Sequence, residues 1–352
     1  MLEPATPYLR VDLKQLRHNI RDVAERASAA GVALRPHVKT HKSPEIARLQ
    51  LDAGAVGITT ATIGEAETFS RNGCDDIFIA YPLWLDETSA RRMRDLLGTA
   101  TVTIGVDSPE AAANAGRLLG DQGLRVLVEV DSGQHRTGVL PRDAGRIAEL
   151  AARSGLDVRG VFTFPGHSYA PDRLVSAARD EADALSEAAA SLRDAGIEPE
   201  VLSGGSTPSL AASDTEVLTE LRPGVYVFND AQQWELGTTA PESIALVCRS
   251  TVVSHAGGRL VLDAGSKTLG ADRAPYNTGW GRLPEFPDAR VVLVAEHHAV
   301  VDLGDATLPP IGSTVDVAPN HVCAAVNLAD HLHVDDQGEV RAWPVAARGQ
   351  NS

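Results

Sequence analysis

The chain of 352 residues has few cysteines, few aromatic residues and no excess of basic charge. Its three cysteines, Cys74, Cys248 and Cys323, are odd in number and far apart, which excludes a disulfide framework. Because 32 lysine and arginine residues stand against 47 aspartate and glutamate residues, the net charge is -15, which argues against nucleic acid or an anionic membrane as the main partner. No apolar run approaches a membrane span, and the N-terminus lacks the basic-then-apolar order of a signal peptide. We therefore expect a soluble, cytoplasmic protein.

The overall composition is that of an ordinary globular protein. Hydrophobic residues make up 43% of the chain and charged residues 22%, which excludes wholesale disorder. A length of 352 residues exceeds one small domain and fits either two domains or a barrel with an appendage.

Short apolar runs alternate with helix-like stretches between about residues 13 and 233. A strand followed by a helix, repeated about eight times, predicts a parallel sheet closed into a (β/α)8 barrel, with a doubly wound open sheet as the alternative. The predicted strands are 32–38, 56–60, 76–80, 101–106, 125–130, 157–162, 199–203 and 217–221, and the predicted helices include 13–30, 43–53, 64–72, 108–119, 142–153 and 173–195.

After residue 233 the chain becomes a series of short β-branched runs between Gly, Pro and Asp turns, which predicts an antiparallel β domain. The extended segment 2–11 could join either domain. We place the barrel at residues 12–233 and the β domain at residues 1–11 and 234–352. The predicted strands of the β domain are 245–253, 259–262, 290–294, 299–302, 313–317, 324–327, 331–334 and 340–343.

The segment LRPHVKTHKS (34–43) is the most informative for chemistry. Two histidines and two lysines, Lys39 among them, follow an apolar strand and precede a helix that Ser43 and Pro44 would begin. Catalytic groups of barrel enzymes lie at the C-terminal ends of the strands, and cationic neighbours help a lysine to lose its proton and act as a nucleophile. The segment alone also fits a solvated basic loop.

A second strand end carries the sequence LSGGSTP (202–208). The backbone of Gly204 and Gly205, with the hydroxyls of Ser206 and Thr207, can bind a phosphate before a helix. No Lys follows as in a P-loop, so the turn alone is weak evidence. Combined with a lysine able to form a Schiff base on another strand, it indicates pyridoxal phosphate.

A third motif, PNHVC, places His321 and Cys323 two residues apart. In an extended chain their side chains share one face, and nitrogen plus sulfur suits zinc. A buried cysteine beside a surface histidine is the alternative. Two further loops, DSGQHRTG (131–138) and FPGHSY (164–169), follow barrel strands and bring polar groups to the same end, where they could also serve as ordinary capping loops.

Together these segments resemble the D-threonine aldolase and D-serine dehydratase family of pyridoxal phosphate enzymes, which has the alanine-racemase-like fold (fold type III). The resemblance covers nearly the whole chain. It rests on PHVKTHK (36–42), VEVDSGQHRTG (128–138), PGHSY (165–169), SGGSTPS (203–209), DAGSK (263–267) and PNHVC (319–323).

The resemblance implies roles for individual residues. Lys39 is similar to the lysine that forms the Schiff base with the cofactor, and Arg136 to the arginine at the cofactor's ring hydroxyl. His167 is similar to the pocket histidine beside the substrate hydroxyl, and Tyr169 is assigned to cofactor binding. The phosphate site would be Gly204, Gly205, Ser206 and Thr207, and the metal pair would be His321 and Cys323, as in the dehydratase branch.

The implied activity is that of a lyase on D-3-hydroxy-amino acids which needs pyridoxal 5′-phosphate and a divalent metal (zinc, manganese or magnesium). We predict the D-threonine aldolase reaction, giving glycine and acetaldehyde. The D-serine dehydratase reaction, giving pyruvate and ammonia, is the alternative. An amino-acid racemase and a non-catalytic pyridoxal phosphate carrier are further alternatives, although a racemase would not need His321 and Cys323 as metal ligands, and a carrier would lack the β domain. The family also implies a homodimer.

Overall fold

The structure is a computed structural model in which residues 4–352 are described. The chain folds into two compact units. The barrel unit comprises Val23–Lys39, Ala47–Gly224 and Gln350–Ser352. The sheet unit comprises the described residues up to Asp22, together with Thr40–Ile46 and Val225–Gly349.

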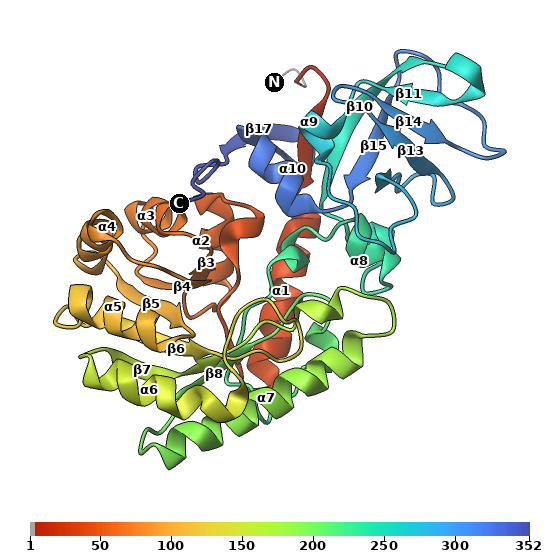
Figure 1. The fold of residues 1–352 in the computed structure, drawn as a ribbon. Coiled ribbons are helices and arrows are strands. Elements are labelled where there is room, and N and C mark those ends of the chain that lie inside the picture. Colours follow the sequence, from red (N-terminus) through yellow and green to blue (C-terminus); the bar gives the residue numbers. More distant parts are fainter. Residues whose placement is uncertain (1–3) are drawn as a thin grey trace. The chain divides into compact units, whose positions relative to one another are not determined.

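An eight-stranded parallel sheet forms the barrel unit (Figure 1). Its strands run in the order β2-β9-β8-β7-β6-β5-β4-β3. The N–H groups of Val56 and Thr59 donate to the carbonyls of Leu34 (2.9 Å) and Pro36 (2.8 Å), which joins the two ends of the sheet. The strands are β2 (Ala33–Leu34), β3 (Ile58–Thr60), β4 (Asp76–Pro82), β5 (Thr101–Val106), β6 (Arg125–Glu129), β7 (Asp157–Phe162), β8 (Val201–Gly204) and β9 (Glu220–Leu221).

This strand order confirms the predicted (β/α)8 barrel. A doubly wound sheet reverses its strand order at a switch point, whereas here the strands from β3 to β9 each pair with the next one along the chain and β2 pairs with β9. The open-sheet alternative is therefore wrong.

Helices alternate with the barrel strands, and several begin at polar N-caps that the sequence makes recognisable. The side chains of Thr62 and Ser108 accept hydrogen bonds from the N–H groups of Glu65 and Ala111, and Pro109 occupies the first turn of its helix. The helices are α1 (Leu13–Ala29), α2 (Pro44–Asp52), α3 (Ile63–Arg71), α4 (Glu87–Leu97), α5 (Pro109–Leu119), α6 (Ala144–Arg153) and α7 (Leu174–Asp194).

Two of the few aromatic residues lie at the centre of the barrel unit. Phe78 and Phe162 pack edge to face with ring centroids 5.0 Å apart, and Leu127 completes their cluster. The guanidinium of Arg222 lies 5.5 Å and 5.3 Å from the centroids of these two rings. The barrel core is thus not purely apolar, because it holds a buried charge that needs buried partners.

Gly160 in β7 is required by its backbone conformation and by its neighbour. Its φ is +145°, and a Cβ there would collide with the carbonyl oxygen of Val201 on β8. We expect Gly160→Ala to lower the free energy of unfolding by about 3 kcal/mol or more, because strain and a backbone clash add. Gly196→Ala, also at positive φ but with nothing within 4 Å, is the control and should cost about 1 kcal/mol. Urea unfolding followed by circular dichroism measures both, and equal losses would contradict the explanation.

A nine-stranded mixed sheet forms the sheet unit, with the path β13-β14-β11-β10-β1-β16-β17 and with β15 pairing to β10 and β12. The predicted strand positions are confirmed except at 324–327. The strands are β1 (Tyr8–Asp12), β10 (Leu246–Ser254), β11 (Leu260–Leu262), β12 (Gly281–Arg282), β13 (Arg290–Val294), β14 (Ala299–Asp302), β15 (Thr314–Pro319), β16 (His331–Asp336) and β17 (Glu339–Pro344).

The N-terminal strand makes this sheet mixed rather than purely antiparallel. β1 pairs antiparallel with β10 but parallel with β16. The N-terminal segment reaches the sheet from far away in the sequence, so no hairpin turn dictates its direction. Of the predicted segment 2–11, residues 2 and 3 lie outside the described residues.

The prediction of a strand at 324–327 is wrong, because this segment belongs to α10 (Val322–Leu328). Two alanines favour a helix there, and Val322, Ala325 and Val326 form its buried face at helical spacing. Shorter helices in this unit are α8 (Ala231–Glu235) and α9 (Ser266–Leu269).

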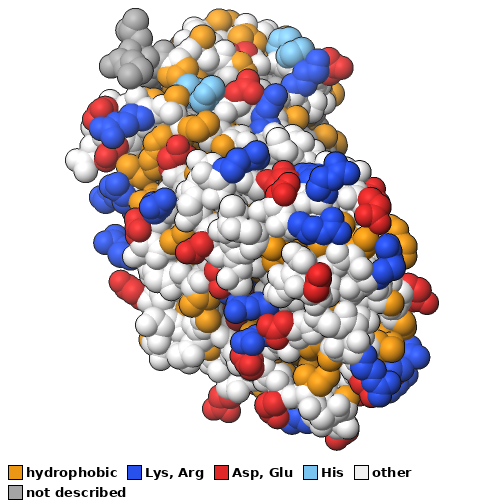
Figure 2. All heavy atoms as spheres, turned by 90° about the vertical axis from the view of Figure 1, so that its left-hand side faces the viewer, with side chains coloured by type: hydrophobic (Ala, Val, Ile, Leu, Met, Phe, Trp, Pro, Cys, Tyr) orange, Lys and Arg blue, Asp and Glu red, His pale blue; other side chains and the backbone are white. Residues whose placement is uncertain are grey.

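The surface carries both signs of charge. On the face drawn in Figure 2, lysine and arginine side chains are interspersed with aspartate and glutamate side chains. Among residues 4–352, no helix combines the length and apolar character that crossing a membrane requires.

Candidate active site

The predicted barrel residues share one end of the barrel. Lys39 follows β2, Arg136 follows β6, His167 and Tyr169 follow β7, and the turn 204–207 begins at the end of β8. Because the strands are parallel, their C-terminal ends lie at the same end of the barrel, where barrel enzymes hold their reacting groups.

The segment around Lys39 is not a solvated basic loop. Lys39 itself is half-buried in a single 3-10 turn, Val38–Thr40. His41 is 0% exposed and its Nδ1 accepts a hydrogen bond from the Ser43 N–H (3.1 Å). Lys42 is 5% exposed and its Nζ donates to Oδ1 of Asn327 (2.7 Å). Lys42 is thus held by a buried hydrogen bond, and Lys39 lies at the end of β2.

The turn after β8 packs closely on buried side chains. Gly205 has a φ of +86°, and a Cβ on Gly204 would collide with the carboxyl group of Glu181. The buried Ser206 hydroxyl lies 2.8 Å from the hydroxyls of both Ser168 and Ser209. The predicted helix after the turn is absent from the described structure, where Leu210–Ala212 forms only a single 3-10 turn. Hydroxyl groups, and backbone N–H groups other than that of Gly205, would hold a phosphate here rather than a long helix dipole.

Glu181 on α7 supports this turn from within the barrel unit. Its Oε1 accepts the N–H of Gly205 at 2.6 Å, and the side chain is 0% exposed. Burial raises the pKa of Glu181 to about 7, although the Gly205 hydrogen bond and Arg222 oppose the shift. The Gly205 N–H is therefore committed to a carboxyl group inside the protein.

Arg222 follows β9 and connects the turn to the barrel core. It donates to the Ser203 hydroxyl and, at 2.6 Å, to the carbonyl of Thr163. Ser203 in turn donates to Glu220 (2.6 Å), which also binds Arg35 (2.6 Å). Burial lowers the pKa of Arg222, and the surrounding carboxylates counteract it. This buried network holds the backbone at Ser203, where the turn 203–207 begins.

The loop after β6 is organised mainly by Asp131. Its carboxylate accepts the N–H groups of Gly133 (2.9 Å) and His135 (3.0 Å) and lies 2.7 Å from the His135 ring. Although burial works against it, these hydrogen bonds hold the pKa of Asp131 below its usual value. The loop presents Arg136 as an exposed side chain whose guanidinium lies 5.5 Å from the ring centroid of Phe164.

His167 lies beside an acidic cavity of about 440 Å³. Its Nε2 is 3.1 Å from Oδ2 of Asp180, and its Nδ1 is buried. The ring packs against Gly133, where an added Cβ would come within 3.3 Å of it. Tyr169 is half-buried and stacks at a tilt on Phe164, with centroids 6.4 Å apart. Asp180 thus orients the imidazole.

His321 and Cys323 lie in the sheet unit, but not on an extended chain as the pattern predicted. His321 is the N-cap of α10 and Cys323 lies in its first turn. Nδ1 of His321 is 3.4 Å from Oδ2 of Asp230, a fully buried carboxylate that also accepts the Val322 N–H (3.1 Å). Burial lowers the pKa of the His321 imidazole, but Cys323 and Asp230 outweigh it and hold that pKa well above its usual value. The Cys323 thiol donates to the Thr40 hydroxyl at 3.3 Å.

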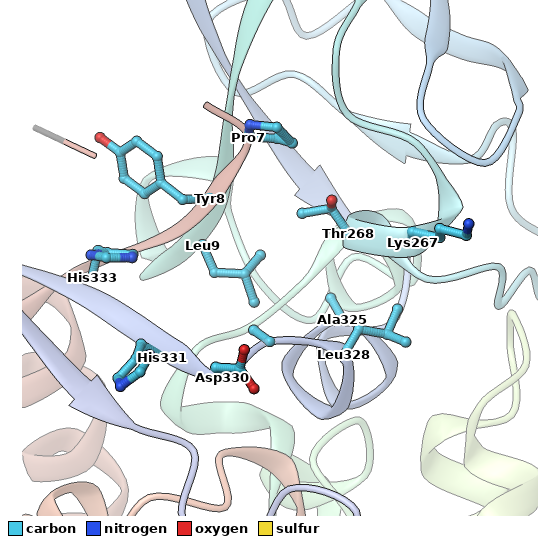
Figure 3. Close-up of a pocket in the computed structure, with 11 residues that line it drawn as sticks. Pro7, Tyr8, Leu9, Lys267, Thr268, Ala325, Leu328, Asp330, His331 and His333 are labelled. Atoms are coloured by element: carbon cyan, nitrogen blue, oxygen red, sulfur yellow. The ribbon is translucent and has the colours of Figure 1, made fainter. Parts of the chain in front are cut away.

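The sheet unit also contains a separate cavity of about 310 Å³ between β1, α9, α10 and β16. Figure 3 shows the Asp330 carboxylate and the Leu9 side chain around this space, with Tyr8 beside His333. The rings of Tyr8 and His333 meet edge-on at 5.1 Å. The residues that line this cavity include none of those that the sequence predicted to be functional.

The sequence predictions missed four side chains that support the predicted ones: Asp180, Glu181, Arg222 and Asp230. Two of them had a detectable signal. Glu181 interrupts the apolar face of α7 that Ala177, Ala178 and Leu185 form, and Asp230 caps α8 by accepting the Gln233 N–H.

Comparisons with known proteins agree with this architecture. A family model described as the N-terminal domain of alanine racemase matches residues 11–232, and a serine dehydratase domain model matches residues 245–334. D-threo-3-hydroxyaspartate dehydratase from Delftia sp. (strain HT23) is 33% identical over 96% of this chain and 96% of the relative. D-threonine aldolase from Arthrobacter sp. is 32% identical over 98% and 93%, and 3-hydroxy-D-aspartate aldolase from Paracoccus denitrificans (strain Pd 1222) is 32% identical over 99% and 93%.

Solved structures show the same likeness. D-threonine aldolase from Filomicrobium marinum has a TM-score of 0.88 and 30% identity over 98% of this chain and 96% of that one. A cysteine-to-alanine mutant of D-threo-3-hydroxyaspartate dehydratase, in the metal-free form, has a TM-score of 0.89 and 30% identity over 97% of both chains. A histidine-to-alanine mutant of the same enzyme matches as well, and its altered histidine lies two positions before the altered cysteine in the sequence of that enzyme. The chain belongs to the alanine-racemase-like family of pyridoxal-phosphate-dependent enzymes that includes D-threonine aldolase and D-threo-3-hydroxyaspartate dehydratase.

Proposed function

We propose that this chain is a lyase which acts on D-3-hydroxy-amino acids with pyridoxal phosphate and a divalent metal ion, and that it runs the D-threonine aldolase reaction. The observation that carries the proposal is the turn 203–207 at the same barrel end as Lys39. The relatives that match nearly the whole chain are aldolases and a dehydratase of D-amino acids with a 3-hydroxyl group.

The barrel residues fit pyridoxal phosphate. Gly204 and Gly205 let the turn pack closely on Glu181 and Leu221, and the hydroxyls of Ser206 and Thr207 follow at the same end of the strand, where they would bind a phosphate. Lys39 would hold the cofactor through its amine, and Arg136 and Tyr169 would lie against its ring. When bound, pyridoxal phosphate supplies an electron sink for negative charge that develops at the substrate Cα.

The sheet-unit pair fits a divalent metal ion. Imidazole nitrogen plus thiolate sulfur favours zinc over magnesium or manganese. Within residues 4–352, no three His, Cys, Asp or Glu side chains converge as a metal site, so two protein ligands would leave positions to water or substrate. A metal held there supplies a Lewis acid that lowers the pKa of a hydroxyl group. Asp230, at Nδ1 of His321, would leave Nε2 to bind the metal.

The product depends on which substrate proton the protein accepts. If His167, oriented by Asp180, accepts the 3-hydroxyl proton, the Cα–Cβ bond breaks and glycine and an aldehyde form. If the Lys39 amine accepts the Cα proton, the 3-hydroxyl group leaves, and a keto acid and ammonia follow. Dehydration is the second candidate, because the spacing of His321 and Cys323 equals that of the two positions altered in the dehydratase mutants.

Product analysis tests the proposal. We expect the protein with pyridoxal phosphate and zinc to convert D-threonine to glycine and acetaldehyde, with 2-oxobutyrate and ammonia as the products of dehydration. D-serine would give pyruvate by the same dehydration. L-Threonine should react at least about a hundredfold more slowly, because a site with fixed groups aligns the reacting bond of one enantiomer, and losing less than half of an alignment worth about 7 kcal/mol already costs that factor. Equal turnover of both enantiomers, or racemised amino acid as the sole product, would reject the lyase.

A further inference from the structure

Glu181 is a buried acid that the proposed reaction does not use. Its Oε1 accepts the Gly205 N–H at 2.6 Å, while its Oε2 is buried and has no hydrogen-bond partner in the described part of the chain. A Cβ on Gly204 would collide with the same carboxyl group. The carboxyl group therefore lies directly against the backbone of the turn 203–207, and its second oxygen carries an unsatisfied lone pair or a proton.

The charges that surround Glu181 do not neutralise it fully. Arg222 is the cation that acts on it, but Arg222 also faces Glu220 and Glu129. Arg35 contributes a second guanidinium, which is shared between Glu220 and Asp76. Asp180, the next residue on α7, is paired with His167, and the hydroxyls of Ser168 and Ser206 beside the turn are neutral. Carboxylates thus outnumber guanidiniums around the turn.

A phosphate group at this turn would add negative charge next to a buried carboxyl. An ionised carboxylate and a phosphate dianion repel each other strongly where water is excluded, and the ionised form already loses hydration by burial. Protonation of the carboxyl removes the repulsion while Oε1 keeps its hydrogen bond from Gly205. Phosphate binding therefore favours the neutral acid.

We propose that Glu181 takes up one proton from solvent when a phosphate group binds at the turn 203–207, so that a neutral carboxylic acid supports the occupied site. The step forms one O–H bond on Glu181 and breaks none in the ligand. The inference rests on the assignment of this turn as the cofactor's phosphate site.

The direction of the pH dependence follows from burial, which raises the pKa of Glu181 to about 7. Below that pH the acid is already protonated before the ligand binds, so little uptake remains. Above it the empty site is ionised, and binding must draw a proton from solvent. Affinity for the phosphate should then fall by up to about tenfold for each further pH unit, in proportion to the one proton taken up.

Isothermal titration calorimetry of the cofactor-free full chain tests this directly. The probe is pyridoxamine 5′-phosphate, which has no aldehyde and so binds without reacting with Lys39. Titrations at pH 8 in two buffers of different ionisation enthalpy count the protons. We expect wild-type protein to take up about one proton more than Glu181→Gln, and Glu181→Gln to bind about tenfold more tightly at pH 8 but equally at pH 6. Asp194→Asn, an exposed carboxylate on the same helix, should behave as wild type.

The outcomes separate the two claims. Equal proton uptake by wild type and Glu181→Gln would overturn the role of Glu181 while leaving the cofactor site intact. Failure of the wild type to bind the probe at any pH would overturn the cofactor site and this inference with it. A readout that needs no variant is difference infrared spectroscopy of the wild type at pH 8. A protonated carboxyl band should appear on binding, and its absence would equally reject the proposal.

Discussion

Lys39→Ala is expected to abolish both lyase activity, by at least about a thousandfold, and the covalent retention of cofactor after borohydride reduction. Lys39 is the lysine that follows β2 at the end of the barrel where the turn 203–207 lies. Removing its amine removes the group that would hold the cofactor aldehyde, but leaves the phosphate turn in place. Intact-chain mass spectrometry after reduction measures the retained cofactor.

Lys267→Ala is the matched control for this experiment. The Lys267 amine is exposed in the sheet unit, where it pairs with Glu296 at 2.9 Å, so its loss should leave retention and activity at the wild-type level. Lys42 is a poor competitor because its buried Nζ already donates to Asn327. Recovery of the reduced cofactor on a peptide that contains Lys42 or Lys267 would show that the assignment of Lys39 is wrong.

The barrel could be predicted from the sequence because its signal is local and repeated. Each β strand is a short apolar run, and helix starts such as Ser108-Pro109 carry their own capping chemistry. The parallel pairing of β1 with β16 could not be predicted, because no local pattern tells an N-terminal strand which neighbour it will meet. The strand predicted at 324–327 is wrong for a related reason. Its short apolar run fits either a strand or a buried helix until its packing is known.

The candidate site also has one part that could be predicted from the sequence and another that could not. The turn 203–207 can be found in the sequence because two glycines and two hydroxyl residues follow an apolar run, and in the structure it lies at the end of β8. Its support by Glu181 and Arg222 depends on which side chains converge inside the barrel, and the sequence does not state this. Glu181 could nevertheless be noticed in the sequence, because a carboxylate on the apolar face of α7 interrupts the hydrophobic pattern around it. Such local conflicts are expected at functional sites.

His321→Ala and Cys323→Ala should each remove the bound divalent metal and most of the activity. Each substitution deletes one of two protein ligands, so we expect metal affinity to fall by at least about a hundredfold, more than the loss of a group that only orients a ligand. Metal content after dialysis, measured by mass spectrometry of the digested protein, checks this. His331→Ala, an exposed histidine on β16, should retain the metal and serves as the control.

The cofactor spectrum of these two variants decides what the metal does. The phosphate turn and Lys39 belong to the barrel unit, whereas His321 and Cys323 belong to the sheet unit. Loss of the metal should therefore leave the absorbance of bound pyridoxal phosphate largely unchanged while turnover stops. Added zinc should restore activity to chelator-treated wild type but not to either variant, because only the wild type keeps both ligands. Full activity in a chelated, metal-free wild-type sample would refute the metal site, since the 3-hydroxyl group would then react without a Lewis acid.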